Sequence, residues 1–576
     1  MKKHFIFLAV AVIWFINFTP FYAQEVDMTK YIEITSTLNP RKAFKMDIGS
    51  SDKFGIDFGD GKIVPYESND SPKEINYILK GKVLKIYGSH INTLSVNGQK
   101  VTSMKIVGDP GLTNLDCSEN EITELDVSSC KSLEDFSCYS NKLIKLVLDK
   151  ENPTKLLTLN ASDNQLSMID LPNTIMLLSL SENKFSDLKI DHLYQLQLLK
   201  VTENNISKLK LPSTNYLQTL IVSYNPLESI DLSGTPNIDL FKCDACKLNS
   251  LDLQPISHSI RTLWCNGNKI ENLDLSNCEN LSVLYAANNK LKTLDLSKVS
   301  NITDLMVSFN SLEELNLGDN PVVYLFINYN NITKISPRSC PSVQYLDAGY
   351  NKLTSIDPSN QFPSCWYFDL TANPLTEFIA TKECVKVMLG STKLQKLNLK
   401  EAVDLRRLDA SHTQIKSLNM PSNYDKLVGC NISGDTELSI QEIKQLIKGL
   451  PDISKTEDPQ PSDDTYNWLK ILDLTSIPNI KSSDYEPAIE KGWKVKFKET
   501  EGIDNLSTIS KFTVEKVGED MISIKNEIKN RTIYIYSING KLMTVFAGSE
   551  KEKTIRLEPN NEYVITDGLN TTKIMM

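Results

Sequence analysis

Aromatic side chains recur at a regular spacing in the middle of this 576-residue chain. Trp264 and Tyr285 lie 21 residues apart, Met306 follows after another 21, and Phe326 after a further 20. Rigid amphipathic rings supply a large contact area with little loss of side-chain entropy, which makes them typical of recognition surfaces. These residues therefore favour the binding of another molecule through apolar and ring contacts.

Further aromatic and acidic residues follow the same spacing and belong to the same predicted surface. The candidate ligand-binding residues are Trp264, Tyr285, Met306, Phe326, Tyr324, Tyr345, Tyr367, Phe309, Tyr329, Tyr350, Asp347 and Asp369. A second interpretation gives the rings a structural role, because rings on neighbouring strands can pack on one another and stiffen a sheet. The sequence favours binding and leaves the structural role as the alternative.

Enzyme chemistry finds little support in the sequence. The histidines are few and widely spaced, and metal-protease, nucleophile-elbow and phosphate-loop motifs do not occur. Asp409, Ser411 and His412 are close together, but adjacent residues of a strand point to opposite faces and cannot converge as a catalytic triad. We therefore expect a protein that is not an enzyme and needs no cofactor.

Eleven cysteines raise the question of a metal site or a disulfide framework. Their number is odd, and several, such as Cys117 and Cys265, fall where a repeated pattern needs a small buried apolar residue. Cys243 and Cys246 resemble half of a zinc site, but no second pair follows, and structural zinc needs four converging ligands. We expect no metal site, and the sequence leaves open whether any cysteines form disulfides.

A repeated element must position all of these side chains. Residues 260–281 contain I-x-x-L-x-C-x-x-N-x-I-x-x-L-D-L-S, and the following residues repeat the pattern. A period of about 21 residues indicates a solenoid, whose units stack because none can bury its apolar side alone. In Leu284-Tyr285-Ala286 the apolar residues point inward on a strand of period two, so that Tyr285 points outward.

An asparagine follows the strand in most of these units. Its side chain can bond backbone groups where the chain turns away from the strand. The predicted structural ladder consists of Asn120, Asn141, Asn164, Asn183, Asn204, Asn225, Asn268, Asn289, Asn310, Asn330, Asn351 and Asn373. Gln99 holds the equivalent position in a degenerate first unit, and Cys246 interrupts the ladder.

The repeated skeleton resembles the leucine-rich-repeat family, whose pattern is L-x-x-L-x-L-x-x-N/C-x-L. The resemblance implies a mainly β fold, a solenoid of about 17 short repeats whose parallel strands form a concave sheet. It further implies that the candidate ligand-binding residues lie on that concave face. We expect a β-rich N-terminal cap, an α/β C-terminal cap and a terminal β-sandwich module around the solenoid.

The points where the period starts and stops give the predicted domains. They are a signal peptide (1–23), a β-rich cap (24–90), the solenoid (91–434), an α/β cap (435–499) and a β-sandwich module (500–576). The signal peptide is predicted from a basic start, an apolar run from Phe5 to Phe18 and the small residue Ala23. Because Phe21 departs from the usual cleavage pattern, a retained membrane anchor is the alternative; the mature chain contains no further apolar run of spanning length.

Two stretches near the C-terminus carry further resemblances. Lys491-Gly492-Trp493 is similar to a closing segment of internalin-like surface proteins from Bacteroidota. The pattern at 533–541, 561–565 and 573–576 resembles the C-terminal sorting domain of the type IX secretion system. That resemblance implies transport of the folded chain across the outer membrane by the type IX machinery. The alternative is a β-sandwich without a sorting role.

Charge and export together define the expected function. A net charge of -10 and a pI of about 5.3 argue against nucleic acid or an anionic membrane as the main partner. We expect a secreted adhesin at the bacterial outer-membrane surface that binds a protein of a host or partner cell through its concave face. The alternatives are a glycan-binding module for nutrient capture and a structural surface-layer component.

Overall fold

The computed structural model describes most of the chain between residues 26 and 575. The described ranges are 26–39, 42–149, 155–335, 340–434, 437–454, 470–497, 513–516, 521–525, 533–537, 542–546, 552–557, 562–566 and 571–575. The predicted signal peptide lies outside them. The chain forms two compact units, Met1–Phe185 and Ser186–Met576. Within the described ranges, no helix has both the length and the apolar character that a membrane crossing requires.

The first unit begins with an antiparallel sheet. Its strand order is β4 (Ile63–Tyr66), β3 (Phe54–Asp57), β6 (Val83–Tyr87), β1 (Tyr31–Ser36) and β8 (Val101–Val107). Alternate residues of β1 are buried, as the alternating apolar pattern of its sequence requires. This sheet contains most of the predicted N-terminal cap.

In the first unit, β7 (Ile91–Ser95) is antiparallel to one neighbouring strand and parallel to the other. Its antiparallel neighbour is β2 (Phe44–Ser50), which also pairs antiparallel with β5 (Asn69–Tyr77). β7 then pairs in parallel with β9 (Asn114–Asp116). The antiparallel strands therefore cover the end of the parallel sheet, whose first strand would otherwise have an unpaired edge.

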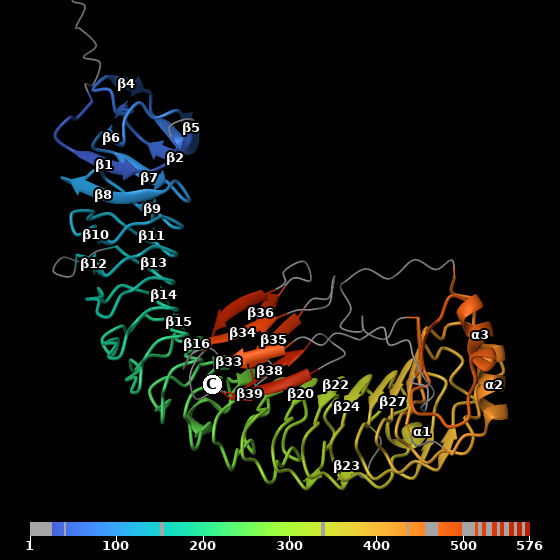
Figure 1. Ribbon diagram of the computed structural model, residues 1–576. Helices are drawn as coiled ribbons and strands as arrows, with labels where there is room; N and C mark the ends of the chain where they lie inside the picture. The colour runs from blue at the N-terminus through green and yellow to red at the C-terminus, as the bar shows by residue number, and fades with distance from the viewer. Residues whose placement is uncertain are drawn as a thin grey trace, which may run out of the picture. The chain divides into compact units, whose positions relative to one another are not determined.

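The rest of the first unit is a coil that has short strands on two sides. The parallel strands β9, β11 (Asp135–Ser137), β13 (Thr158–Asn160) and β14 (Leu177–Ser179) form one side of the coil. β10 (Glu124–Asp126) and β12 (Lys145–Val147) pair on the other side, which we call the outer side (Figure 1).

The second unit repeats this arrangement over more coils. Its first parallel strands are β15 (Leu198–Lys200), β16 (Thr219–Ile221), β17 (Leu240–Lys242), β18 (Thr262–Trp264), β19 (Val283–Tyr285) and β20 (Asp304–Met306). The sheet continues with β22 (Tyr324–Phe326), β24 (Tyr345–Asp347), β25 (Tyr367–Asp369), β27 (Lys386–Met388), β29 (Arg407–Asp409) and β30 (Gly429–Asn431).

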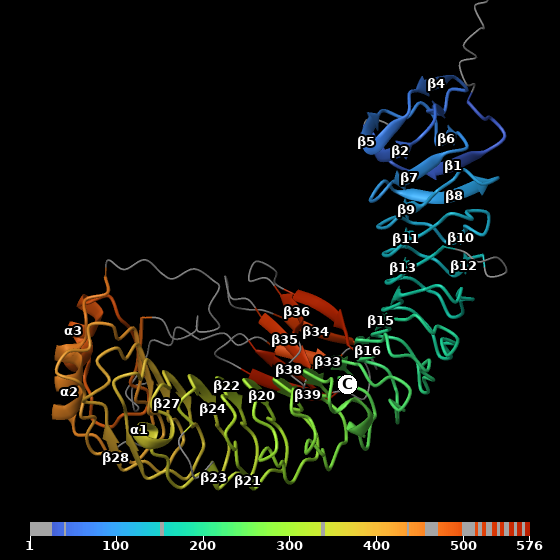
Figure 2. The same ribbon diagram turned by 180° about the vertical axis from the view of Figure 1, so that it is seen from behind.

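The outer side of the second unit carries short elements and no long helix among the described residues. They are η1 (Gln254–Ile256), β21 (Glu314–Leu315), β23 (Lys334–Ile335), α1 (Pro358–Gln361), β26 (Glu377–Ile379) and β28 (Lys396–Asn398). Figure 2 shows β21, β23 and β28 on the side opposite β20, β22 and β24. Repeats of about 21 residues are too short for a full helix on this side.

The core runs along the inside of the coil. The middle residue of each parallel strand is buried, as in Leu263, Leu284 and Leu305, and the residue after each of these strands is buried as well, as in Cys265. The first and last residues of the same strands point away from the core. The period-two alternation thus determines which side chains reach solvent.

The parallel sheet extends beyond the last recognisable repeat. β30 pairs with β31 (Ile471–Asp473), and β31 pairs with β32 (Lys494–Lys496). α2 (Ile440–Gly449) and α3 (Ser482–Glu490) accompany these strands, and Trp493 Nε1 donates to the carbonyl of Pro451 at 3.0 Å. The repeat pattern ends before the fold does because two further coils use different sequences.

The C-terminal strands form two antiparallel sheets. One contains β33 (Thr513–Lys516), β34 (Met521–Lys525) and β37 (Glu552–Arg556). The other contains β35 (Ile533–Ser537), β36 (Leu542–Phe546), β38 (Glu562–Thr566) and β39 (Thr571–Met575). β35 and β36 pair with each other, and residues 538–541 between them lie outside the described residues.

Candidate functional site

Six candidate residues stand side by side at the last position of successive strands. The register joins Trp264 to Tyr285, Tyr285 to Met306, and Met306 to Phe326. It continues from Phe326 to Asp347 and from Asp347 to Asp369. We call these six residues the central column. Neighbouring members are one strand spacing apart, about 4.8 Å.

Three tyrosines form a second column at the first position of the same strands. Tyr324 pairs with Tyr345, and Tyr345 pairs with Tyr367. The rings of Tyr345 and Tyr367 are stacked with their centroids 3.9 Å apart and their planes 8° apart. Tyr324 is 45 % exposed. This tyrosine column lies beside the central column because the two positions share one face of each strand.

A third column occupies the turns that follow the strands. The rings of Phe309 and Tyr329 are stacked at 4.4 Å, and those of Tyr329 and Tyr350 at 4.2 Å. All three residues have left-handed backbone angles, with φ of 54°, 53° and 55°. They are 41 %, 41 % and 47 % exposed. We call them the turn column, and the sequence pattern alone gave no sign of their backbone conformation.

Other coils show what the turn position normally holds. It is left-handed there too, and in the second unit the residues are Glu203, Tyr224, Ala245, Gly267, Asn288, Ala372, Ser391 and His412. Glycine and asparagine adopt this conformation most readily, and a bulky ring is an uncommon choice. The three successive rings of the turn column are therefore unusual for their backbone position.

Trp264 sits at the end of the aromatic part of the central column. Its ring is stacked on Tyr285 at 5.1 Å, and Lys242 Nζ lies 3.2 Å from the ring centroid on the register of the preceding strand. Partial burial lowers the pKa of Lys242. The indole Nε1–H of Trp264 is buried and has no hydrogen-bond acceptor among the described residues. Lys242 is not among the candidate residues, because its contact with the ring arises only where neighbouring coils stack.

The other end of the central column is acidic. Asp347 accepts a hydrogen bond from Gly349 N at 3.4 Å, and Asp369 accepts one from Thr371 N at 3.0 Å. Burial, and then the neighbouring charge of Asp369, raises the pKa of Asp347 to about 7, although the Gly349 N–H and Lys386 act in the opposite direction. Asp347 is therefore close to half-ionised near neutral pH.

Tyrosines surround this Asp347–Asp369 pair. Burial raises the pKa of Tyr329 to about 12, and the Tyr350 hydroxyl and both aspartates contribute to the shift. Burial also raises the pKa of Tyr367, with contributions from Asp369, Tyr345 and Asp347. The tyrosine column and the turn column thus approach the carboxylates from two sides, and all twelve candidate ligand-binding residues belong to one continuous surface.

The asparagine ladder holds adjacent coils together. Asn268 is typical: its Nδ2 donates to the carbonyls of Cys265 at 3.0 Å in its own coil and Cys243 at 2.9 Å in the preceding one. Its Oδ1 accepts from Leu248 N at 3.1 Å. One side chain thereby satisfies backbone groups of two coils that would otherwise be buried without partners.

The ladder is interrupted at one position, and an asparagine outside the ladder makes similar hydrogen bonds. At Cys246 a thiol makes only long contacts, 3.6 Å to the carbonyl of Val222 and 3.7 Å to that of Asp244. On the outer side, buried Asn320 accepts from Ile302 N at 2.9 Å and donates to Val299 O at 2.8 Å. Asn320 was not singled out in the sequence because its position does not recur as asparagine in other repeats.

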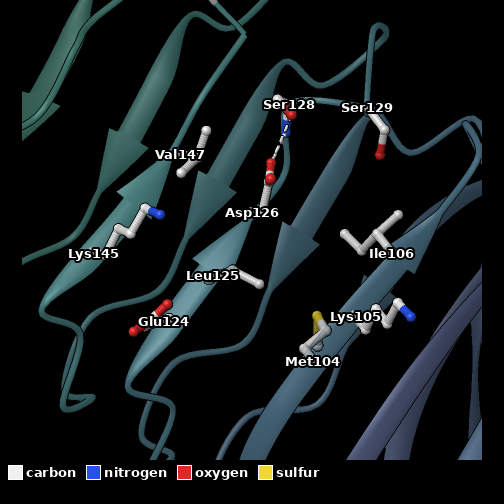
Figure 3. A pocket seen from close by; sticks show the side chains of 10 residues that line it. All are labelled: Met104, Lys105, Ile106, Glu124, Leu125, Asp126, Ser128, Ser129, Lys145 and Val147. Carbon is white, nitrogen blue, oxygen red and sulfur yellow. Dashed lines mark hydrogen bonds between the residues drawn. The ribbon is translucent and has the colours of Figure 1, made fainter.

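The outer side offers grooves but fewer groups aimed at a ligand. A groove of about 410 Å³ in the first unit is lined by residues of β8, β10 and β12 (Figure 3). Its Asp126 Oδ1 accepts from Ser128 N at 2.9 Å, and Asp274 in the second unit bonds Ser276 N in the same way. These outer aspartates are turn residues that bond their own backbone. A groove of about 730 Å³ adjoins α1 and is lined by charged, polar and aliphatic side chains.

Comparison with known proteins bears on the fold. No protein-family model matches the sequence. The protein phosphatase PHLPP-like protein of Drosophila melanogaster is 39% identical over 77 residues, which are 13% of this chain and 8% of that protein. This chain therefore spans a small part of the curated relative that it matches.

Several solved structures of bacterial proteins are similar. YopM from Yersinia enterocolitica has 25% identity and a TM-score of 0.51, over 60% of this chain and 79% of that one. The functional domain of InlJ from Listeria monocytogenes, which includes a cysteine ladder, has 20% identity and a TM-score of 0.39, over 88% and 93%. The Leptospira interrogans leucine-rich-repeat protein LIC12759 has 19% identity and a TM-score of 0.44, over 67% and 95%.

Proposed function

We propose that this leucine-rich-repeat solenoid is a binding scaffold, an adhesin displayed at the cell surface that holds a protein of a host or partner cell on its aromatic face. The observation that carries the proposal is the turn column, three successive exposed rings on left-handed backbone. A left-handed conformation costs a non-glycine residue about 1–2 kcal/mol, so the three rings together cost about 3–6 kcal/mol. Their two stacking contacts return only about 1–3 kcal/mol.

This imbalance supports binding over a purely structural role of the rings. If stiffening the sheet were their only use, Asn or Gly at the turn positions would serve the fold better, as Gly267 and Asn288 do in the two preceding coils. A ring that the fold does not need, and that remains 41–47 % exposed, is available to a partner. The stacking that the structure contains thus accompanies recognition and does not replace it.

The ring geometry favours a protein partner over a glycan. Sugar rings bind aromatic side chains by lying flat on an open ring face. Two rings of these columns have contacts on both faces, because Trp264 lies between Lys242 and Tyr285, and Tyr329 lies between Phe309 and Tyr350. Ring edges and hydroxyl groups remain for contact, which suits the apolar and polar side chains of a protein.

We further propose that residues 1–23 direct export and that residues 500–576 direct transport by the type IX machinery to the outer-membrane surface. Support for export comes from the basic and apolar residues of the N-terminus. Support for the sorting role comes from the sequence resemblance and from the antiparallel strands of the last segment, which are compatible with a compact β module.

A triple substitution tests the adhesin proposal. Changing Trp264, Tyr285 and Phe326 together to alanine removes three rings from the central column. We expect this variant to lose most of the adhesion of the wild-type protein to a panel of immobilised extracellular-matrix proteins and to host cells. Unchanged adhesion by a folded variant would exclude this face as the main site, and binding confined to a glycan array would favour the glycan alternative.

A second variant guards against a loss caused by misfolding. Changing Phe309, Tyr329 and Tyr350 to asparagine places a preferred residue on left-handed backbone. Because the relief of the left-handed backbone outweighs the lost stacking, its free energy of unfolding should not fall below that of the wild type. Adhesion should still fall, and circular dichroism should show an unchanged fold.

A further inference from the structure

The Asp347–Asp369 pair is an acidic site inside an otherwise uncharged part of the aromatic face. Both carboxylates belong to the central column and follow Phe326 in the register. Tyr345 and Tyr367 lie on the same strands, and Tyr329 and Tyr350 lie at the adjoining turns. Strand spacing places the two aspartates about 4.8 Å apart at the backbone.

Few groups among the described residues offset the negative charge of the Asp347–Asp369 pair. Each carboxylate accepts one backbone N–H from its own turn. No ion pair among the described residues includes Asp347 or Asp369. The Lys386 ammonium, whose charge lowers the pKa of Asp347, stands over the ring of Tyr367 with its Nζ 4.6 Å from the centroid. Two partly buried carboxylates without an ion-pair partner are costly to the free protein, and a cation from outside would relieve that cost.

The residues around the Asp347–Asp369 pair favour some cations over others as its partner. A divalent metal ion prefers several oxygen ligands at once, and no group of three or more His, Cys, Asp and Glu residues in the described part of the chain could hold one. A guanidinium group is planar and carries five N–H donors in a fork that matches paired carboxylates. The tyrosine hydroxyls beside the pair can accept its remaining donors, and their rings can contact the aliphatic stem.

We propose that the Asp347–Asp369 pair binds the guanidinium group of an arginine carried by the partner polypeptide. This inference rests on the proposed function, because it names the partner chemistry of the same aromatic face. It accounts for the sign of the charge there, since Asp304, Asp347 and Asp369 are the charged residues at the first and last positions of the sheet strands β18, β19, β20, β22, β24 and β25. Lys242 on β17 and Lys386 on β27 lie at the two borders of this part of the sheet.

The apolar half of the central column defines what should accompany the arginine. Met306 and Phe326 precede the aspartates by two coils, a distance of about 10 Å between the two pairs. In an extended polyproline-type segment, residues three apart lie on the same side at about 9 Å. The expected recognition element is therefore an arginine with an aromatic or large aliphatic residue three positions away.

Synthetic peptides test this element on the full-length protein. The probe is a fluorescein-labelled peptide with a Phe-Pro-Pro-Arg core between Gly-Ser flanks, and its analogues carry citrulline or lysine in place of arginine. Fluorescence anisotropy at pH 8 should give an affinity about tenfold higher for the arginine peptide than for the neutral, nearly isosteric citrulline peptide. The lysine peptide should fall between them, because an ammonium lacks the fork.

A pair of matched variants locates the effect. Asp347→Asn with Asp369→Asn should abolish the preference for arginine over citrulline. The control, Asp274→Asn with Asp295→Asn, changes the net charge equally on the outer turns and should keep the preference. Circular dichroism should show both variants folded, since asparagine matches aspartate in size.

Three results would overturn the inference. They are equal affinity for the arginine and citrulline peptides, a preference that survives in the Asp347/Asp369 variant, and a preference that disappears when a chelator removes divalent cations. If the adhesin proposal itself were wrong, the alanine substitutions at Trp264, Tyr285 and Phe326 would leave adhesion intact. The two failures can therefore be told apart.

Discussion

At the scale of single residues, Asp347 shows how the site differs from the scaffold around it. Its pKa of about 7 lies above the ordinary value of 3.8 because the carboxyl is largely buried and stands next to Asp369. Between these two values the folded protein holds a proton that the unfolded chain releases. The free energy of unfolding therefore falls as the pH rises through this window, which is the opposite of the behaviour of a carboxylate paired with a cation.

Replacing this carboxyl should stabilise the free protein. We expect Asp347→Asn to raise the free energy of unfolding by about 1–2 kcal/mol at pH 8, after allowance for the partial exposure of the side chain. The gain should shrink toward pH 4, where the wild-type carboxyl is protonated. Urea unfolding at the two pH values measures the difference.

The control for this prediction is an outer-turn aspartate. Hydrogen bonds from Ser276 lower the pKa of Asp274, so that Asp274→Asn should bring no stabilisation at pH 8. A loss of stability in Asp347→Asn at pH 8 would contradict the prediction, because it would mean that the ionised carboxylate has a favourable partner in the free protein.

At the scale of the structural element, each coil depends on a side chain supplied by the next. The ladder asparagine accepts an N–H from the preceding coil, as Asn268 does from Leu248 and Asn225 does from Ile206. At Cys246 the thiol supplies no oxygen acceptor for the equivalent N–H of Leu227. The stability of a solenoid is a sum over neighbouring units, so one weak contact between coils lowers the whole.

Restoring the ladder should strengthen that contact. We expect Cys246→Asn to raise the free energy of unfolding by about 1 kcal/mol, because it replaces two long thiol contacts with amide hydrogen bonds. Chemical denaturation provides the measurement.

The neighbouring cysteine supplies a contrasting substitution. Cys265 lies at an apolar core position and is fully buried, so Cys265→Asn should destabilise the protein by about 2 kcal/mol or more. Equal effects of the two substitutions would show that the ladder position has no special requirement for an amide.

At the scale of the whole molecule, the chain combines segments with separate tasks. The parallel coils of the second unit carry the aromatic face, and α2 and α3 accompany the last strands of that unit's sheet. In the first unit, the antiparallel strands cover one end of its parallel sheet. The division into a signal peptide, two caps, a solenoid and a sorting module remains a prediction, as does display at the cell surface.

Export and sorting can be tested by the mass of the mature protein. If both segments are removed during export, intact-mass spectrometry of the protein released from the cell surface should show a chain that starts at Gln24 and ends near Ser510. A mass that includes residues 511–576 would contradict removal of the sorting module, and a mass that includes residues 1–23 would favour the retained anchor.

The sequence by itself determined the coil and the orientation of its side chains. A period of about 21 residues requires stacked units, and the alternation of a strand requires Trp264 to point outward when Leu263 and Cys265 point inward. These properties depend on residues a few positions apart, so they can be read locally. The list of outward rings and the ladder asparagines follows from them.

The tertiary structure decided everything that depends on atoms from neighbouring coils. The stacking of Tyr345 on Tyr367, the raised pKa of Asp347 and the approach of Lys242 to Trp264 each join residues about 20 positions apart. The left-handed backbone at Phe309 and the continuation of the sheet into β31 and β32 also carry no clear sign in the sequence. Stacking brings these groups within a few ångströms of one another, and that proximity gives the aromatic face its chemistry.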